Sequence, residues 1–267
     1  MELKDLTGFE LGTQELVYTE RDAILYALAV GAKTDQLDLV YERELRALPT
    51  YACALGLWAV EAAGELGAYD RTRSLHASQR LVMHAPMPPK GPIQSSGRVV
   101  NVWDKGKAAV VDIEVSADIF TASYAIFLPG LGGWGGERGP SAASADSQPE
   151  YDWKSIVETV EDQATLYRLT GDRHPIHIDS EVARANGFDR PILHGLCTLG
   201  IAAREIANAV DAHPANLREI EAKLAAPVMS GDTIEVCAAK TSQGQLRFEA
   251  TVGETVVLKG GRALFGD

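Results

Sequence analysis

The sequence predicts an α+β protein in which one plan, a buried helix followed by an antiparallel sheet, occurs twice. Three observations predict it: the two halves share sequence motifs, each half has an apolar helical stretch, and each ends in short segments in which apolar and polar residues alternate. A Gly-, Ser- and Ala-rich stretch at 129–150, which includes "GLGGWGG", has linker composition and divides the chain near its middle. We therefore expect an N-terminal repeat at 1–128, a linker at 129–150 and a C-terminal repeat at 151–267.

The repeat is visible near the start of each half. "ERDAILYALAVGA" at 20–32 matches "EDQATLYRLTGD" at 161–172 with one gap, through an acidic start, an alanine, and then Tyr, Leu and Gly. Farther along, "LPTYACALG" at 48–56 aligns with "LHGLCTLG" at 193–200, and a long apolar stretch of small residues begins at each of them. These stretches predict one long buried helix in each half. In the second stretch, the residues at helical spacing are Leu196, Leu199, Ala203, Ile206, Ala207 and Val210.

Alternating strands follow each predicted helix. The C-terminal half reads "REIEAKLAAPV", "TIEVCAAKTS", "QLRFEATV" and "TVVLKGGRALF", with short turns at "SGD", "QG" and "GE". The N-terminal half repeats the pattern with "ASQRLVMHAPMPPKG", "PIQSSGRVVNVW", "KAAVVDIEVS" and "TASYAIFLPG". Period-2 alternation joined by short turns is typical of an antiparallel meander, which can wrap the helix.

Composition narrows the class of protein. The net charge of −12 argues against a nucleic-acid partner or an anionic membrane surface, because both require a positive face. Three cysteines without a CxxC motif indicate a reducing compartment and no disulfide framework. The N-terminus lacks the apolar run of a signal peptide, and no stretch suits a membrane helix. We expect a soluble cytoplasmic protein.

The stretch "GDRHPIHIDS" at 171–180 concentrates titratable groups in ten positions. Asp172 and His177 suit an acid–base pair, because burial and mutual interaction can tune their pKa values around neutrality. A solvated turn and a metal site through His174, His177 and Asp179 are the alternatives. The N-terminal repeat has Gly31-Ala32 at the matching place and no histidine in the following "KTDQLDLVYERE", which favours catalysis by one repeat. A metal is disfavoured because no second His/Cys cluster accompanies the loop.

Several longer sequence motifs carry a family resemblance. These are "YRLTGDRHPIHID" at 167–179 and "FDRPILHGLCTLG" at 188–200, with "GDTIEV", "LHASQRL" and "VWDKG". They resemble the MaoC-type (R)-specific 2-enoyl-CoA hydratases, the hydratase 2 group. The resemblance implies two fused hot-dog repeats, each an antiparallel sheet wrapped around a long central helix. It also implies that the first repeat binds the acyl chain and the second carries the chemistry. One departure is visible: the family pattern is Gly-Asp-x-Asn-Pro-x-His, and His174 replaces the Asn here.

The resemblance implies specific roles. Asp172 and His177 are the acid–base pair, the Gly195 N–H at a helix start receives the thioester oxygen, and His174 orients the reactants. His194 is interpreted as a packing or hydrogen-bonding residue. The positions that match substrate- or CoA-contacting residues of the family are His76, Ala77, Lys105 and Leu224.

The expected activity is therefore reversible hydration of trans-2-enoyl-CoA to (R)-3-hydroxyacyl-CoA, in fatty-acid or sterol side-chain metabolism. The reaction needs no metal or redox cofactor, since CoA is part of the substrate. Family likeness also implies a homodimer. The alternatives are a 3-hydroxyacyl-carrier-protein dehydratase or acyl-CoA thioesterase on the same fold, or a non-catalytic acyl-CoA-binding subunit. The acyl chain length stays open.

Overall fold

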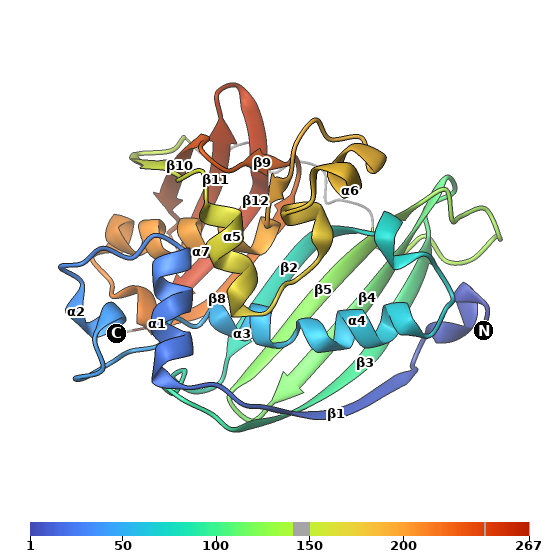
Figure 1. Ribbon diagram of the computed structural model, residues 1–267, viewed down its shortest axis with the longest axis horizontal. Coiled ribbons are helices and arrows are strands. Elements are labelled where there is room, and N and C mark those ends of the chain that lie inside the picture. Colours follow the sequence, from blue (N-terminus) through green and yellow to red (C-terminus); the bar gives the residue numbers. More distant parts are fainter. Residues whose placement is uncertain (141–149, 243, 267) are drawn as a thin grey trace.

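The computed structural model describes residues 1–140, 150–242 and 244–266. Ten described strands form one antiparallel sheet in the order β1-β3-β4-β5-β2-β8-β12-β11-β10-β6, and helices lie against one face of it (Figure 1). A separate two-stranded ladder joins β7 to β9. The strands are β1 Glu10–Leu16, β2 Leu75–Met83, β3 Ile93–Asp104, β4 Ala108–Ala117, β5 Phe120–Pro129, β6 Trp153–Glu158, β7 Ile192–Leu193, β8 Leu217–Leu224, β9 Val228–Met229, β10 Thr233–Lys240, β11 Leu246–Val252 and β12 Thr255–Phe265.

The sheet shows the repeat directly. Read outward from the centre, the N-terminal half runs β2-β5-β4-β3-β1 and the C-terminal half runs β8-β12-β11-β10-β6. The two halves meet where β2 pairs antiparallel with β8, with Leu81 opposite Ile220. The predicted α+β plan with an antiparallel sheet in each half is confirmed. All eight predicted alternating segments form strands of the large sheet.

The edge strands β1 and β6 carry no sequence pattern that predicted them. In β1 every residue except Leu11 and Leu16 is exposed, and β6 places Ile156 on the surface with 61% of its area accessible. An edge strand is held by hydrogen bonds on one side and by few apolar contacts. Its sequence therefore lacks the apolar alternation that marks the inner strands.

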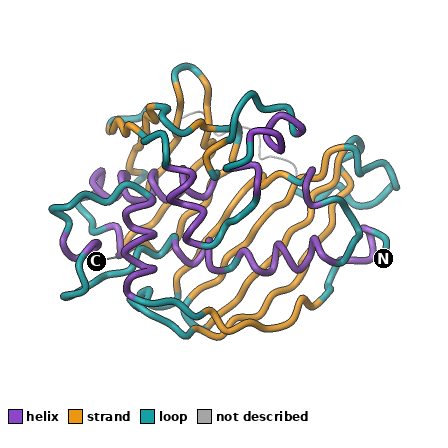
Figure 2. Tube along the Cα trace, in the orientation of Figure 1, coloured by secondary structure: helices purple, strands orange, loops and turns teal. Residues whose placement is uncertain are grey.

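The helices occupy the concave side of the sheet and the ends of the molecule (Figure 2). Helix α7 is buried along nearly its whole length, as the apolar spacing predicts. The α-helices are α1 Glu20–Ala29, α2 Leu37–Val40, α3 Tyr51–Leu55, α4 Leu57–Glu65, α5 Gln163–Tyr167, α6 Ser180–Ala185 and α7 Gly195–Ile206. The 3-10 helices are η1 Leu3–Leu6, η2 Arg71–Arg73, η3 Arg168–Thr170, η4 Pro175–His177, η5 Ala207–Val210 and η6 Pro214–Asn216. No helix of the described chain is both long and apolar enough for a membrane span.

The central helix of the N-terminal repeat differs from the single long helix that the sequence predicts. It is divided at Gly56 into α3 and α4. The Tyr124 hydroxyl donates to the Cys53 carbonyl at 2.8 Å, the carbonyl that a continuous helix would pair with the Leu57 N–H. A Cβ on residue 56 would lie 2.3 Å from the Tyr124 hydroxyl oxygen, so glycine is required there. A long-range contact from β5 therefore interrupts the helix.

The two repeats are joined by buried contacts between α1 and the C-terminal helices. The Ala29 carbonyl accepts hydrogen bonds from the Gln163 amide at 2.6 Å and the Cys197 thiol at 3.3 Å. The Arg204 Nε donates to the Val30 carbonyl at 3.2 Å. The last turn of α1 therefore anchors both α5 and α7, the elements that flank the predicted catalytic loop.

The predicted linker at 129–150 lies partly outside the described residues, since 141–149 are not among them. Strand β5 continues to Pro129, and residues 130–140 form a loop against the β3–β4 turn. The Asp104 carboxylate accepts the N–H groups of Gly106, Gly133 and Gly135, each at 2.8 Å. These hydrogen bonds, foremost that of Gly133, lower the pKa of Asp104 to about 2. The Gly-rich run therefore ties the linker to the N-terminal sheet.

Candidate active site

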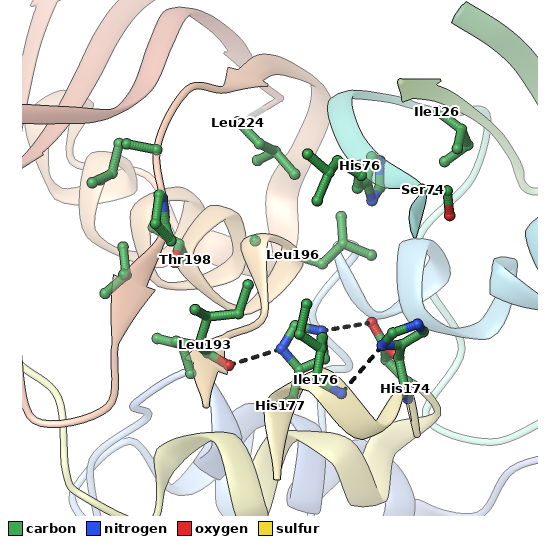
Figure 3. A pocket seen from close by; sticks show the side chains of 18 of the residues that line it. Ser74, His76, Ile126, His174, Ile176, His177, Leu193, Leu196, Thr198 and Leu224 are labelled. Carbon is green, nitrogen blue, oxygen red and sulfur yellow. Dashed lines mark hydrogen bonds and ion pairs between the residues drawn. The ribbon is translucent and has the colours of Figure 1, made fainter. Parts of the chain in front are cut away.

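A cavity of about 290 Å³ lies between the two repeats (Figure 3). Its walls are mainly apolar and come from α4, β2 and β5 of the N-terminal repeat and from the catalytic loop, α7 and β8 of the C-terminal repeat. A concave, mostly apolar site with a few polar groups is typical of a small-molecule site. The predicted site residues that line it are Asp172, His174, His177, Gly195, His76 and Leu224.

Asp172 and His177 face each other across a short gap. The Asp172 Oδ2 and His177 Nε2 atoms lie 3.9 Å apart, and both side chains are mostly shielded from solvent. This distance is too long for a direct hydrogen bond. An oxygen atom beside the line that joins them could lie about 2.8 Å from each of the two atoms. The other carboxylate oxygen, Oδ1, accepts the His174 N–H at 3.1 Å, which fixes the carboxylate to its own loop.

Gly171 brings this loop close to the N-terminal repeat. It has φ +148°, a conformation that L side chains rarely adopt, and a Cβ there would lie 3.1 Å from the Ala54 carbonyl oxygen of α3. Any other side chain would push the loop away from α3. Glycine therefore places Asp172 at the boundary between the repeats.

The hydrogen bonds of His177 fix the position of its proton. Its Nδ1 lies 2.8 Å from the Ile192 carbonyl, which can only accept, so Nδ1 carries the hydrogen and Nε2 presents a lone pair toward Asp172. Burial lowers the pKa of His177 below its ordinary value, although Asp172 and the Ile192 carbonyl oppose this. The imidazole is therefore neutral at pH 7 and can accept a proton at Nε2.

Asp172 is ionised. Burial alone would raise the pKa of Asp172, but the neighbouring imidazoles of His194 and His177 and the His174 N–H together hold it below the ordinary value. The cavity therefore presents two proton acceptors, the Asp172 carboxylate and the His177 Nε2. A water molecule could donate one hydrogen bond to each.

His194 supports both members of this pair. Its ring stacks on His177 with centroids 3.6 Å apart and planes 24° apart. Its Nε2 lies 3.1 Å from the Asp172 backbone carbonyl, so Nε2 is the protonated nitrogen. Burial lowers the pKa of His194 to about 3, so this ring is neutral. His194 is thus a hydrogen-bonding residue, as interpreted from the sequence, but it binds the catalytic loop rather than its own helix end.

Asp172, His177 and His194 also bring three potential metal-ligand atoms within 4.8 Å of one another. The stacked rings fit a metal poorly. Lone pairs lie in the ring planes, and these planes are nearly parallel, so one ion could not lie close to both planes at the usual bond length of about 2.1 Å. The set His174, His177 and Asp179 is not assembled either, because Asp179 accepts the Glu181 N–H at 2.8 Å and caps α6.

His174 stands where the family pattern has Asn. Its Nδ1 accepts the Ile176 N–H at 3.3 Å and caps η4, which leaves Nε2 as the protonated nitrogen of the neutral ring. Burial lowers the pKa of His174, and the nearby His177 adds to this. A neutral His174 can therefore offer an N–H donor to the cavity, as an Asn side-chain amide could.

Gly195 begins α7 and lines the cavity. The N–H groups of the first helical turn have no partner inside the helix and lie at the positive end of its dipole. A Cβ on residue 195 would lie 2.5 Å from Leu224 Cδ1, so only glycine fits without moving this wall. Among the described residues no hydrogen-bond partner is found for the Gly195 N–H, so this N–H can donate to a ligand.

The remaining predicted contact residues divide into two groups. His76 lines the cavity with its Nε2 held at 3.0 Å from the Ser78 carbonyl, and burial lowers its pKa to about 4. Ala77 lies in a register shift between β2 and β5 and is not among the lining residues. Lys105 also lies away from the lining, at the β3–β4 turn, where its ammonium donates to the Arg138 and Pro140 carbonyls. A role for Ala77 and Lys105 in substrate binding stays a prediction.

The structure adds lining residues that the sequence analysis missed. Glu61 projects from α4 into the cavity wall, where burial and the charge of Asp172 raise its pKa. A lone acid in the apolar run "LWAVEAAGEL" was the available signal. Ser74, Ile126 and Thr198 also line the cavity and carry no local pattern that marks them.

Comparison with family models divides the chain in the same way as the sheet. Residues 16–127 match the MFE-2 hydratase 2 N-terminal domain, and residues 142–260 match the MaoC like domain. The two matches therefore fall on different repeats.

Curated relatives agree with these matches. The chain is 35% identical over 245 residues to enoyl-CoA hydratase ChsH3 of Mycobacterium tuberculosis, which covers 86% of each protein. It is 36% identical to 3-hydroxyacyl-thioester dehydratase Y of the same organism, over 88% of this chain and 86% of that protein. Peroxisomal enoyl-CoA hydratase 2 of Arabidopsis thaliana is 32% identical, over 86% and 84% respectively.

Solved structures show the same fold. A MaoC-like dehydratase from Phytophthora capsici superposes with a TM-score of 0.88 and 26% identity, over 99% of this chain and 97% of that one. A Mycobacterium tuberculosis protein described as having a double hotdog fold superposes with a TM-score of 0.61 and 17% identity, over 98% and 97%. The predicted fold class of two fused hot-dog repeats is confirmed.

Proposed function

We infer that this chain, which belongs to the MaoC-like hydratase 2 family, is an (R)-specific 2-enoyl-CoA hydratase. It adds water to a trans-2-enoyl-CoA to form the (R)-3-hydroxyacyl-CoA, or catalyses the reverse dehydration. One observation carries the proposal: two proton acceptors, the Asp172 carboxylate and the His177 Nε2, face one gap of 3.9 Å beside an open helix N-terminus. This arrangement suits the activation of one water next to a thioester.

The pair can carry out the whole addition with one water. The water donates its hydrogens to Asp172 and His177, loses one proton to the pair, and its oxygen forms the bond to Cβ of the enoyl group. The electrons of the double bond move toward the thioester oxygen. The pair then returns a proton to Cα, so that the enzyme ends in its starting protonation state. Because one site handles both steps, both new bonds form on the same face of the substrate.

The start of α7 stabilises the charge that develops on the thioester oxygen. The Gly195 N–H lies at the positive end of a helix of 12 residues, and such groups bind an enolate oxygen more strongly than a neutral carbonyl. His174 supplies a further N–H donor beside the pair and orients the water or substrate. Its place next to Asp172 supports this role.

The N-terminal repeat binds rather than reacts. At the place of Asp172 it has Ala32, which is buried, and its matching loop has no histidine. Its contribution to the cavity wall is largely apolar and includes Leu57, Val60 and Ile126. These side chains suit an acyl chain, which gains from removal of apolar surface from water.

The proposal includes no metal or redox cofactor. Hydration is redox-neutral, and the Asp–His pair with the helix N-terminus accounts for each proton and charge. CoA enters as part of the substrate, and the net charge of −12 gives no support to a nucleic-acid or membrane partner. A homodimer and a cytoplasmic location complete the proposal. Three free cysteines support a reducing compartment, while the Arabidopsis relative is named as peroxisomal.

A panel of trans-2-enoyl-CoA thioesters of increasing chain length tests the activity. We expect the absorbance of the conjugated thioester to fall on hydration and chiral analysis to identify the (R)-3-hydroxy product. Release of free CoA thiol without loss of the double bond would instead indicate a thioesterase. Binding of every thioester without turnover would indicate a non-catalytic subunit.

A further inference from the structure

A second cavity, of about 400 Å³, adjoins the reaction cavity on the side of the N-terminal repeat. The two cavities share two lining residues, Leu57 and Glu61 of α4. The rest of the second lining comes from the end of β1, from α3, and from Thr170 and Gly171, which precede the catalytic Asp172. The exposed lining of the reaction cavity is mainly apolar, whereas that of the second cavity is mainly polar. A ligand that extends past Leu57 and Glu61 therefore meets polar groups.

Glu61 has a counterpart in the C-terminal repeat that plays a structural role. Glu61 and Glu205 each stand five residues after the glycine that ends the two aligned helix motifs. The Glu205 carboxylate lies 2.6 Å from the Arg204 guanidinium and accepts the Ser155 hydroxyl at 2.7 Å, and its side chain is only 12% exposed. The two glutamates occupy equivalent helix positions, but only Glu205 is tied to the protein in this way.

The carboxylate of Glu61 is uncommitted. Among the residues that the structure describes, no hydrogen-bond or ion-pair partner is found for it. The other acid of the second cavity, Glu15, accepts the Gln94 amide at 3.0 Å, and the Thr170 hydroxyl donates to the Tyr167 carbonyl at 2.8 Å. Glu61 is partly exposed, so water hydrates its carboxylate until a ligand covers it. Once covered, this carboxylate needs a donor from the ligand, because an unpaired charge is costly to remove from water.

The reacting groups set the direction of the acyl chain. In the proposed function, the thioester oxygen binds at Gly195 of the C-terminal repeat, and Cβ lies beside Asp172 and His177. The N-terminal repeat forms the remaining wall, which includes Val60 and Glu61 of α4. An acyl chain that continues beyond Cβ, away from the thioester, therefore passes along α4 toward the second cavity.

We propose that Glu61 selects thioesters whose acyl tail carries a hydrogen-bond donor, foremost a hydroxyl group, and that the second cavity binds this end of the tail. This step rests on the proposed function. A tail hydroxyl donates to the carboxylate and replaces the water that the tail displaces. A plain alkyl tail of the same length displaces the same water but provides no donor, so it is disfavoured. Glu61 is thus a specificity-determining residue that takes no part in the proton transfers.

The experiment uses pairs of trans-2-enoyl-CoA thioesters of increasing chain length. The two members of a pair have the same number of carbon atoms, and the tail ends in a methyl group in one and a hydroxymethyl group in the other. The variants are Glu61→Leu, Glu61→Gln and a matched control, Glu65→Gln, which removes a charge one turn later on α4, outside both linings. The ratio of kcat/KM within each pair measures the preference.

Once the tail is long enough to reach the second cavity, the wild-type ratio should favour the hydroxylated member about 10-fold, the effect of one charge-assisted hydrogen bond. Glu61→Leu should favour the methyl member instead. Glu61→Gln should keep part of the wild-type preference, because its amide oxygen still accepts a hydrogen bond. Glu65→Gln should keep the wild-type ratio. Within the shortest pair, the ratio should stay near one in every variant.

Two results would overturn the proposal. One is a wild-type ratio near one at every length. The other is an equal fall for both members of every pair in Glu61→Leu, which would show that Glu61 acts on Asp172 and His177 and not on the tail. If the wild-type protein hydrated no thioester, the proposed function would fail separately. Calorimetric titration with the same pairs would still test Glu61, since tighter binding of the hydroxylated member in the wild-type protein, lost in Glu61→Leu, needs no turnover.

Discussion

The His194 ring stacks on the His177 ring at 3.6 Å and donates from its Nε2 to the backbone carbonyl of Asp172 at 3.1 Å. One buried side chain thus contacts both members of the acid–base pair. It lies directly before α7, so the element that presents the Gly195 N–H also holds the catalytic loop. The relative position of base, carboxylate and helix N-terminus is set by this contact.

Replacement of either member of the pair should abolish efficient hydration. We expect Asp172→Asn and His177→Ala each to lower kcat by at least about 100-fold, because each removes one of the two groups that can take up a proton from the water. The hydration assay with a short trans-2-enoyl-CoA measures the effect. Asp179→Asn is the matched control, since Asn caps a helix as well as Asp does. His84→Ala removes an exposed histidine. Wild-type rates in both site variants would refute the assignment.

His194→Phe separates the two contacts of His194. Phenylalanine retains a ring that can stack on His177 but leaves the Asp172 carbonyl without its donor. An unpaired buried polar group costs about 1–3 kcal/mol, so we expect the free energy of unfolding in urea to fall by that amount. The catalytic loop should shift, and kcat should fall more than KM rises. Unchanged kcat and stability in this variant would remove His194 from the positioning role.

The pH dependence of activity follows from the neutral state of His177. Burial lowers the pKa of His177 below the ordinary value of about 6.5, and the base must be unprotonated to act. The kcat/KM for hydration should therefore stay level near neutrality and fall only on the acid side of about pH 6.5. An acid limb above that pH would show that burial does not lower the pKa of His177.

Stability should also fall in acid because of His194. Its folded-state pKa is about 3, whereas an unfolded histidine titrates near about 6.5. Between these values the unfolded state binds the extra proton, so stability is complete above about pH 6.5 and falls as pH drops toward about 3, by up to about 1.4 kcal/mol per pH unit. Urea unfolding at pH 7 and pH 5 measures the difference. It should be smaller in His194→Phe than in the wild-type protein.

Gly195→Ala tests the opening at the start of α7. The new methyl group would lie 2.5 Å from Leu224 Cδ1 and would displace that side chain, which lines the cavity. We expect kcat/KM to fall by at least about 10-fold, since one oxyanion donor contributes about 100-fold or more. Leu224→Ala in the same protein returns the space, so the double variant should recover part of the lost kcat/KM. A double variant no better than Gly195→Ala would show that the loss has another origin.

Local patterns predicted the inner strands and α7 because each contains its own signal. Alternation with period 2 marks a strand that faces a core on one side, and the spacing of apolar residues marks α7. The edge strands β1 and β6 lack this signal, since few of their residues are buried. The division of the N-terminal helix at Gly56 depends on Tyr124, which lies 68 positions away in the printed sequence.

The residues of the site likewise divide into those that a local sequence pattern reveals and those that only the fold brings together. Asp172, His174 and His177 are found together in the sequence because one loop carries them, and the comparison of the two repeats points to that loop. Glu61 and the stacked ring of His194 reach the site from other elements. No spacing along the chain brings these residues to the same place.

The sequence by itself determined the α+β plan, its duplication and the loop with Asp172 and His177, because the pattern that indicates each of them lies within a few tens of consecutive residues. The tertiary structure alone decided which nitrogen of His177 is free, how far it lies from Asp172, and which side chains of the N-terminal repeat line the cavity. Those properties depend on hydrogen bonds and burial between residues far apart in the chain, and they exist once the two repeats close around the cavity.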